Sequence, residues 1–256
     1  MITLTFNSEA TIARTLASVA GQSWPNIEHI IVDGGSSDST LAELDSFRSQ
    51  IATLVSGSDN GIYDAMNKGV ALSTGDVICF LHSDDIYAHS GVIEQIAKIF
   101  SMKSEQHASI DAVYGDVSYF RANRPNRIVR RFRSDRFSPE NLAWGWMPAH
   151  TALFLRKTVF QEVGLFDPSY KIAGDFEFIV RAFWNQNRST SYIPEILVKM
   201  QIGGASTSGL RSKILLNREV LRACRSNGLK TNYAKILSRY FRKIFELYLF
   251  GVPKKF

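Results

Sequence analysis

Two adjacent carboxylates, Asp84 and Asp85, are the side chains of this sequence best placed to do chemistry. They follow the apolar run 77–81, which is short enough to be a strand covered on both faces. Such a strand would deliver both residues to the carboxyl edge of an open α/β sheet, where ligands bind. Adjacent carboxylates repel each other unless a cation is bound, and Mg²⁺ prefers one or two carboxylates together with phosphate oxygens. The pair therefore predicts a divalent metal that carries a diphosphate, with an ordinary helix N-cap as the alternative.

Two upstream strands are predicted to end in polar loops at the same sheet edge. The run 2–6 ends at Asn7, and the run 27–32 ends at Asp33 in a turn rich in Gly and Ser. This arrangement suits a nucleotide, because one carboxylate can bind base or ribose hydroxyls while another holds a metal on the phosphates. Three ordinary turns capped by Asp and Ser would explain each loop separately, but they explain the three together poorly.

A series of short motifs runs across residues 2–181. In order they are Thr5-Phe6-Asn7, Ser18-Val19 with Gln22-Ser23-Trp24-Pro25, Asp33-Gly34-Gly35-Ser36-Ser37-Asp38, Gly61-Ile62-Tyr63-Asp64-Ala65-Met66-Asn67-Lys68-Gly69, Gly75-Asp76, Ser83-Asp84-Asp85 and Gly174-Asp175-Phe176-Glu177. In this order they resemble the inverting glycosyltransferases of family 2, which have the GT-A fold. The resemblance is closest to enzymes that build bacterial exopolysaccharide, O-antigen or capsule repeat units. The sequence departs from the family at His82, where Asn is more usual.

This resemblance implies roles for individual residues. Asp33 and Asp59 would contact the base and ribose of a nucleotide-sugar donor. Asp84 and Asp85 would form the metal-binding motif, with Asp85 as the direct ligand of Mn²⁺ or Mg²⁺. Asp175 would be the catalytic base. The donor-binding set implied in this way is Thr5, Asn7, Asp33, Asp59, Asp64, Lys68 and Asp84.

Asp175 also has a plain structural interpretation. It opens a predicted helix with apolar residues Phe178, Ile179 and Phe183, so it lies at or near the N-cap, where the positive helix end favours its ionised form. As a general base it would remove the proton from the acceptor hydroxyl that attacks the anomeric carbon. The two roles are compatible. Glu177 is predicted to be a supporting or surface carboxylate, with a contact to the acceptor as the alternative.

The segment with Trp144, Trp146 and His150 is predicted to contact the acceptor, because flat indole rings stack on sugar faces. The tryptophans could equally anchor a loop on the core, and His150 could make a hydrogen bond there. Lys68 has two interpretations as well: it could bind the donor diphosphate, or it could pair with Asp64, four residues earlier on one helix face.

Two glycine- or arginine-rich segments also have more than one interpretation. Glycines in the segment 201–207 would let it close over the donor diphosphate, or it could be an ordinary connection. The segment 121–136 holds seven arginines and one acid. It could be a solvated hairpin, a contact to an acceptor diphosphate, or a contact to anionic lipid.

The order of predicted elements indicates an α/β fold with a doubly wound, mostly parallel sheet, in agreement with the GT-A resemblance. An antiparallel insertion is plausible at 112–155. At 256 residues the chain can bury one large core. We expect a catalytic domain over residues 1–210 and a basic, amphipathic helical extension over residues 211–256. Cys79 and Cys224 are predicted to be buried thiols rather than disulfide partners or metal ligands.

The net charge of +6 is unevenly distributed. Residues 1–120 hold 5 Lys or Arg against 15 Asp or Glu, whereas residues 211–256 hold 12 against 2. An acidic nucleotide half argues against nucleic-acid binding there, because a phosphate backbone would be repelled. In the tail, apolar residues recur at helical spacing over residues 233–250 with Lys and Arg between them. This pattern predicts peripheral binding to an anionic membrane, with burial in the soluble core as the alternative.

The sequence as a whole predicts a metal-dependent inverting glycosyltransferase that moves a sugar from a nucleotide diphosphate sugar to a saccharide acceptor, lipid-linked by preference, in cell-surface polysaccharide synthesis. No apolar run reaches the roughly 18 residues of a membrane span, and the first residues lack a signal pattern. We therefore expect a cytoplasmic location, peripheral on the inner face of the membrane. The alternatives are a nucleotidyltransferase, and a non-catalytic regulator that binds sugar nucleotides. The first would carry a Gly-rich loop with a basic residue after the first strand, which this sequence lacks.

Overall fold

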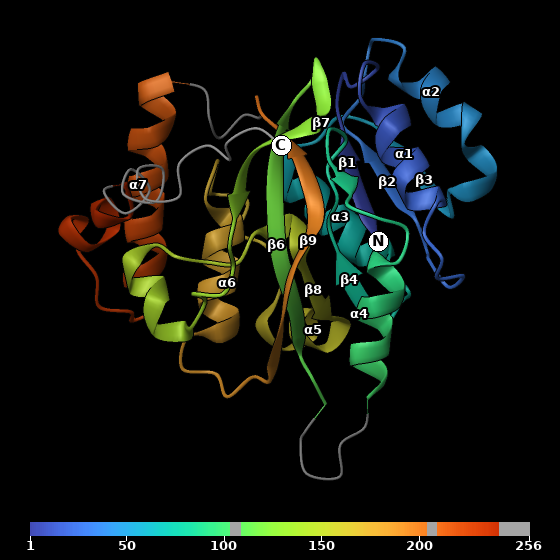
Figure 1. The fold of residues 1–256 in the computed structure, drawn as a ribbon. Coiled ribbons are helices and arrows are strands. Elements are labelled where there is room, and N and C mark those ends of the chain that lie inside the picture. The colour runs from blue at the N-terminus through green and yellow to red at the C-terminus, as the bar shows by residue number, and fades with distance from the viewer. Residues whose placement is uncertain (103–108, 204–208, 241–256) are drawn as a thin grey trace.

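The structure is a computed structural model that describes residues 1–102, 109–203 and 209–240. Its strands are β1 (Ile2–Thr5), β2 (Ile30–Asp33), β3 (Thr53–Ser56), β4 (Val77–Cys79), β5 (Ile86–Tyr87), β6 (Ala112–Arg121), β7 (Arg124–Phe132), β8 (Leu153–Arg156) and β9 (Thr190–Gln201). Its helices are α1 (Ile12–Ala20), α2 (Thr40–Ser46), α3 (Ile62–Leu72), α4 (Val92–Ser101), α5 (Lys157–Val163), α6 (Gly174–Phe183) and α7 (Gly209–Ser226). Residues 233–240 are also helical. In Figure 1 the N-terminal elements lie on one side of the molecule and α7 on the other, with β6 and β9 between them.

A parallel sheet of order β1-β2-β3 forms the N-terminal half of the fold. Thr5, Asp33 and Ser56, the last residues of these strands, lie level in the register. The backbone N–H of Leu81 donates to the carbonyl of Ile2 (3.0 Å), so the segment that follows β4 runs parallel beside β1. As predicted, the loops that follow several strands therefore meet at one sheet edge.

The second sheet has the order β4-β8-β6-β9-β5, with β7 paired to β6. Only β6 and β9 are parallel in it, and the other pairs are antiparallel. The predicted α/β fold is confirmed, and antiparallel pairing extends beyond the insertion expected at 112–155. The reason is that β6 and β8 are joined without a helical crossover, so they can pair antiparallel, and β8 then pairs with β4 in the same way.

Helix α3 carries much of the longest motif and packs directly against the parallel sheet. A Cβ atom on Gly69 would lie 2.4 Å from Cγ2 of Ile2, so only glycine permits this close approach. Met66 and Val70 are buried in the same core cluster as Ile2. This packing fixes the start of α3 beside the polar loops at the sheet edge.

Two predictions about the rest of the chain can be compared with the structure. Within the described ranges, no helix is both long and apolar enough to cross a membrane. Cys79 in β4 and Cys224 in α7 are buried and unpaired, as predicted.

Candidate functional site

Hydrogen bonds join the loops that follow β1, β2 and the segment after β4. The hydroxyls of Ser8 and Ser83 lie 2.8 Å apart, which connects the first loop to the acidic pair. The Oδ1 of Asn7 accepts the backbone N–H of Ser37 (2.9 Å), which connects the first loop to the second. Thr5, directly beneath, is buried, and its hydroxyl has no protein partner. The structure thus brings these predicted residues together, with Asn7 holding two loops in place.

Asp33 organises the turn that it opens. Its Oδ2 accepts the backbone N–H groups of Gly35 (3.1 Å) and Ser36 (3.0 Å) and the hydroxyl of Ser56 (2.6 Å). The side chain is 1% exposed. The carboxylate is therefore largely satisfied inside the turn, and it holds the ends of β2 and β3 together.

Asp59 lies beside an exposed aromatic ring at the same edge. Its Oδ1 accepts the N–H of Gly61 (2.9 Å), which leaves Oδ2 over Gly34. A Cβ atom on Gly34 would lie 2.8 Å from that Oδ2 and 3.4 Å from Cδ2 of Phe6. Phe6 is 61% exposed, so its ring is available to a ligand. An aromatic face and a carboxylate oxygen therefore lie together above the end of β2.

Asp64 and Lys68 pair with each other across one turn of α3 (3.2 Å), which confirms the structural interpretation of this pair. Asp64 also accepts the backbone N–H of Asn60 (3.0 Å), and Lys68 donates to the carbonyl of Ser58 (3.2 Å). The two side chains together hold the turn that carries Asp59.

Asp85 is a buried carboxylate with a free oxygen. The residue is 1% exposed, and its Oδ2 has no protein partner. Burial raises its pKa well above the ordinary value, and the neighbouring Asp84 adds to this effect. A hydrogen bond from the backbone of Gln201 and the charge of Arg14 act in the opposite direction. Asp84 itself is half-buried. Within the described parts of the chain, no third His, Cys, Asp or Glu joins them to form a metal cage.

Asp175 lies in the first turn of α6, as predicted, but it is not the residue that caps the helix. The N-cap position belongs to Ala173. Buried Glu219 of α7 accepts the backbone N–H groups of Lys171 (2.8 Å), Ile172 (2.9 Å) and Ala173 (2.8 Å). These donors precede α6, so Glu219 fixes the segment that leads into the helix, whereas Asp175 accepts the first-turn N–H of Phe176.

Several groups surround the carboxylate of Asp175. Its Oδ1 accepts the N–H of Phe176 (2.8 Å) and the hydroxyl of Tyr63 (3.4 Å). Its Oδ2 lies 3.3 Å from Nδ1 of His150. Burial raises the pKa of Asp175 to about 6, against the lowering effects of the Phe176 N–H, His82 and Tyr63. The result is a carboxylate whose basicity is matched to neutral pH.

His82 and His150 are in contact through their Nε2 atoms (2.8 Å). Burial lowers the pKa of each ring to about 4, while the charges of Asp84 and Asp175 raise that of His82. His82 therefore lies within electrostatic reach of both the acidic pair and the carboxylate at the start of α6. The structure places the predicted residue His150 beside Asp175, with Nδ1 3.3 Å from Oδ2.

The helical residues 233–240, called the C-terminal helix, hold the loop of Trp144 and Trp146 in place. Arg239 donates through Nη1 to the carbonyl of Gly145 (3.3 Å) and through Nη2 to Asn217 of α7 (2.7 Å). The amino group of Lys235 lies 5.4 Å from the centroid of the Trp144 ring. Gly145 has a φ of +72°, and a Cβ atom there would lie 2.8 Å from Arg239. The predicted acceptor loop is therefore positioned partly by the tail.

Arg239→Ala should lower the melting temperature by about 2–4 °C, because it removes hydrogen bonds that join the loop, α7 and the tail, worth roughly 1 kcal/mol. Arg225→Ala, an exposed arginine on α7, is the matched control and should melt like the wild type. Thermal unfolding followed by circular dichroism measures both. Equal melting temperatures for the two variants would show that Arg239 does not hold the loop and the tail together.

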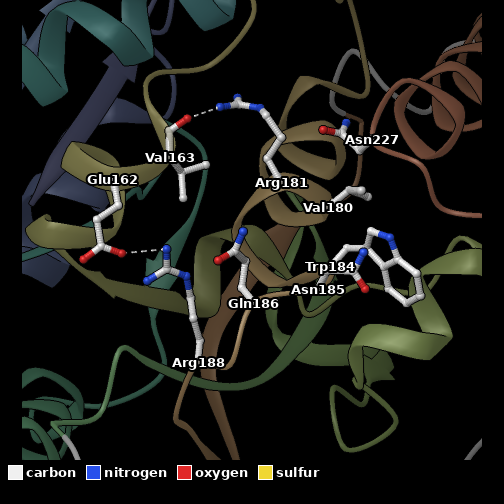
Figure 2. Close-up of a pocket in the computed structure, with 9 residues that line it drawn as sticks. All are labelled: Glu162, Val163, Val180, Arg181, Trp184, Asn185, Gln186, Arg188 and Asn227. Atoms are coloured by element: carbon white, nitrogen blue, oxygen red, sulfur yellow. Dashed lines mark hydrogen bonds and ion pairs between the residues drawn. The ribbon is translucent and has the colours of Figure 1, made fainter.

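Glu177 lies apart from these residues. It is two positions after Asp175, so it is on the opposite face of α6, where it pairs with Arg181 (2.6 Å). Arg181 borders a polar pocket of about 440 Å³, in which Arg188 pairs with Glu162 (Figure 2). Its lining residues are Glu162, Val163, Val180, Arg181, Trp184, Asn185, Gln186, Arg188 and Asn227. The contact of Glu177 with an acceptor stays a prediction.

The arginine segment is largely a β-hairpin, formed by β6 and β7. Arg131 pairs with buried Asp116 (2.6 Å), and the guanidinium of Arg136 lies 5.9 Å from the ring centroid of Trp146. Arg121, Arg124 and Arg127 are exposed. The carbonyl of Phe120 accepts the N–H of Ile202 (2.9 Å), so the hairpin tip lies beside the end of β9.

Sequence reasoning assigned no role to several residues of this site. Phe6 could have been noticed as an aromatic residue between two predicted donor contacts. His82 was visible as a departure from the family pattern, but its contact to His150 spans 68 residues. Glu219 carries no local signal, because its contacts depend on the packing of α7. Gln201 opens the segment 201–207 that was predicted to close over the donor diphosphate, and residues 204–207 of that segment lie outside the described residues.

Comparisons with known proteins agree with this geometry. The family model described as glycosyl transferase family 2 matches residues 1–164. A "PGL/p-HBAD biosynthesis glycosyltransferase" of Mycobacterium bovis is 29% identical over 218 residues, which cover 84% of this chain and 80% of the relative.

Solved structures share the fold. S. aureus TarS 1-349 in complex with UDP-GlcNAc has a TM-score of 0.69 at 19% identity, over 98% of this chain and 75% of that one. The chain spans only 45% of a longer TarS structure. The mannosyltransferase PcManGT from Pyrobaculum calidifontis, in complex with GDP-Man and Mn²⁺, has a TM-score of 0.60 at 14% identity, over 97% of this chain and 80% of that one.

Proposed function

The chain belongs to glycosyl transferase family 2, and we propose that it transfers one sugar, with inversion, from a nucleotide diphosphate sugar to a hydroxyl of a saccharide acceptor. The observation that carries this proposal is the position of His82. It contacts His150, which lies beside Asp175, and the charges of both Asp84 and Asp175 raise its pKa. Inverting transfer needs a leaving-group site on one side of the anomeric carbon and a base on the other. In this proposal Asp84 and Asp85 supply the first, Asp175 supplies the second, and His82 lies between them.

The donor nucleotide lies at the ends of β1 and β2 in this proposal. Phe6 offers an exposed ring on which a base can stack, and the Oδ2 of Asp59 beside it can accept a ribose hydroxyl. Asp33 contributes to donor binding indirectly, because it holds in place the turn that follows β2. UDP-GlcNAc and GDP-Man in the structural neighbours make uracil and guanine nucleotides the first donors to test.

The residues at Asp85 fit a divalent cation. Its buried Oδ2 lacks a partner, and a hard oxygen donor of this kind suits Mn²⁺ or Mg²⁺. Two carboxylates are sufficient when donor phosphates complete the coordination. We assign Asp85 as the ligand, with Asp84 beside it. A bound cation supplies Lewis-acid stabilisation of the leaving nucleotide diphosphate.

Asp175 acts as the general base in this proposal. Its carboxylate accepts the proton of the acceptor hydroxyl as that oxygen attacks the anomeric carbon, and the bond to the diphosphate oxygen breaks. The Phe176 N–H and the Tyr63 hydroxyl hold Oδ1 in place. Trp144 and Trp146, which precede His150 in the chain, would contact the acceptor sugar.

The pH dependence of transfer follows from the raised pKa of Asp175. A base must be ionised to accept a proton, so kcat/KM should rise about tenfold per pH unit below pH 6 and level off above it. Nucleotide release measured from pH 4.5 to 8.5 at saturating metal tests this. The acidic limb should vanish in the residual activity of Asp175→Asn. A limb that persists in that variant would assign it to another group.

The acceptor is proposed to be lipid-linked, with the protein on the inner face of the membrane as a peripheral protein. Basic charge supports this, because twelve Lys or Arg lie in residues 211–256 and four exposed arginines lie on the β6–β7 hairpin, of which Arg131 is paired with Asp116. Of the predicted amphipathic segment 233–250, residues 241–250 lie outside the described residues. Within the described part Ile236 is buried, whereas Tyr233 and Leu237 are exposed.

A chain that ends at Tyr240 should bind anionic vesicles more weakly than the full chain, because it loses Arg242, Lys243, Lys254 and Lys255. This end point keeps Ile236 and the Arg239 contacts, so the fold is preserved. Co-sedimentation with phosphatidylglycerol vesicles at low and high salt measures the difference. Equal pelleting of both chains would remove the last sixteen residues from the proposal.

The experiment that tests the proposed function is a panel of nucleotide sugars incubated with the full chain and Mn²⁺. Release of a nucleoside diphosphate from one donor, abolished by EDTA, is expected. Tight binding of a donor without any release would favour the non-catalytic regulator.

A further inference from the structure

We propose that the tip of the β6–β7 hairpin, residues 121–130, binds an anionic lipid surface. Its arginines lie at the lipid phosphates in this arrangement, and Ile128 and Val129 enter the headgroup region. The inference rests on the lipid-linked acceptor of the proposed function. It adds the element that meets the membrane, and it turns the sheet edge with the acidic pair toward that membrane.

The hairpin tip carries positive charge that no nearby acid neutralises. Residues 121–133 include six arginines and no Asp or Glu. Two of the six pair with acids outside this stretch. Among the described residues, Arg121, Arg124 and Arg127 have no acidic partner, and all three are exposed. Such a cluster attracts an anionic surface, because each basic residue near that surface adds to the attraction.

Two adjacent aliphatic side chains lie among these arginines. Ile128 is 48% exposed and Val129 is 45% exposed. In the strand register Phe120 pairs with Ile128, and Tyr119 pairs with Arg130. Val129 is therefore an extra residue, which forms a β-bulge. Charges and a bulge on an edge strand discourage pairing with another strand, but exposed aliphatic residues work against that purpose. A membrane interface uses both, because binding there scales with buried apolar area plus attraction to anionic lipid.

Nucleic acid fits this surface less well than lipid. A phosphate backbone would bind the arginines and leave both aliphatic side chains in water. The acidic N-terminal half, with 15 Asp or Glu against 5 Lys or Arg in residues 1–120, would also repel it. An acidic protein could pair with the arginines too, and binding to protein-free lipid vesicles separates that partner from lipid.

Direct contacts connect the hairpin tip to the edge of the sheet that holds the acidic pair. The guanidinium carbon of Arg14 lies 5.0 Å from the ring centroid of Phe120, the residue opposite Ile128. The next residue of α1, Thr15, donates its hydroxyl to the carbonyl of Asp85 (2.8 Å). In Figure 1 β7 rises beside the arrowhead of β9. Lipid bound at the hairpin tip would therefore bring a lipid-linked saccharide to this edge.

Two arginine substitutions test the charge. Arg124→Gln and Arg127→Gln should each lower the partition coefficient of the full chain on phosphatidylglycerol vesicles about fivefold, and the loss should shrink at high salt. Arg48→Gln removes an exposed arginine after α2, and this matched control should bind like the wild type. Co-sedimentation measures each chain. An equal loss with Arg48→Gln would show that only the net charge matters and would overturn the role of the hairpin.

A substitution of both aliphatic residues tests the apolar contact. Ile128→Ser with Val129→Ser should lower binding roughly tenfold and keep the salt dependence of the wild type, because no charge is removed. Leu165→Ser, at a side chain that is 46% exposed outside the hairpin, is the matched control. All these side chains are exposed, so the melting temperatures should not change. Unchanged binding of the doubly substituted chain would contradict the entry of Ile128 and Val129 into the headgroup region.

A fluorescent label reports this entry directly. Cys79 and Cys224 are buried, so the thiol introduced by Ile128→Cys can be labelled selectively with an environment-sensitive fluorophore. Its emission should shift to shorter wavelength on phosphatidylglycerol vesicles and stay unchanged on phosphatidylcholine vesicles. The same label introduced by Leu165→Cys should not shift on either. An emission that stays unchanged for Ile128→Cys on phosphatidylglycerol would overturn the inference.

The inference and the proposed function fail differently. A wild-type chain that releases nucleotide from no donor would overturn the proposed function. An active wild type that ignores anionic vesicles, or whose hairpin variants bind them as well as it does, would overturn the role of the hairpin and leave sugar transfer intact.

Discussion

Asp85→Ala should reduce metal-stimulated nucleotide release by at least about 10³-fold, because Lewis-acid stabilisation of a leaving diphosphate is worth several kcal/mol. The Oδ2 of Asp85 has no protein partner and burial disfavours the ionised carboxylate, so the fold should survive the substitution. Asp45→Ala, an exposed carboxylate on α2, is the matched control and should keep full activity. Activity is measured with and without Mn²⁺ for each chain. Undiminished release by Asp85→Ala, or by the wild type in excess EDTA, would refute the metal assignment.

The stability of the metal-free protein gives a second readout at the same residue. The pKa of Asp85 is raised in the fold, so its ionised form is disfavoured there relative to the unfolded chain. This penalty is present above the pKa in the fold and disappears as the pH falls below the ordinary carboxyl range. Asp85→Asn should therefore melt higher than the wild type at pH 8 and similarly at low pH. Such a gain is typical of residues retained for function at a cost in stability.

Asp175→Asn should lower kcat by roughly 10²- to 10⁴-fold with donor affinity almost unchanged, because it removes the base and keeps the size of the side chain. The asparagine keeps an acceptor oxygen for the backbone N–H of Phe176, so the substitution should change the melting temperature little. Isothermal titration with UDP-GlcNAc or GDP-Man, together with initial rates, separates binding from turnover.

Glu219→Gln is the structural control for this substitution. It weakens the hydrogen bonds that fix the segment before α6 and leaves Asp175 intact, so it should lower the melting temperature more than it lowers kcat. If Asp175→Asn instead lost activity in step with stability, the capping interpretation of Asp175 would be correct.

Much of the site could be predicted because it depends on strand order. Thr5 and Asp33 end strands with clear apolar runs, Asp85 follows the apolar run 77–81, and the ends of parallel strands meet at one edge. By contrast, β3 was not predicted. Its four residues are half-buried or exposed and do not alternate between buried and exposed positions. The sequence therefore lacks the alternating apolar pattern that predicts a strand.

Other features depend on tertiary contacts that no local pattern contains. Glu219 holds the segment before α6 from 46 residues or more away, and His82 meets His150 across 68 residues. The burial of the apolar residues in the C-terminal helix could not be predicted from the local sequence either. Ile236 is buried and Leu237 is exposed, although both fit one helical pattern. Periodicity indicates which face is apolar, but only packing determines what covers it.

The most direct test of sugar transfer at this site is ¹H NMR of the sugar released when water replaces the acceptor. UDP-GlcNAc and GDP-Man carry α-linked sugars, and a single displacement with Asp175 as base predicts that the β anomer of the free sugar appears first. The signal should require Mn²⁺ and should be absent with Asp175→Asn. The α anomer appearing first, or release that is unaffected by Asp175→Asn, would contradict an inverting transfer that uses this carboxylate.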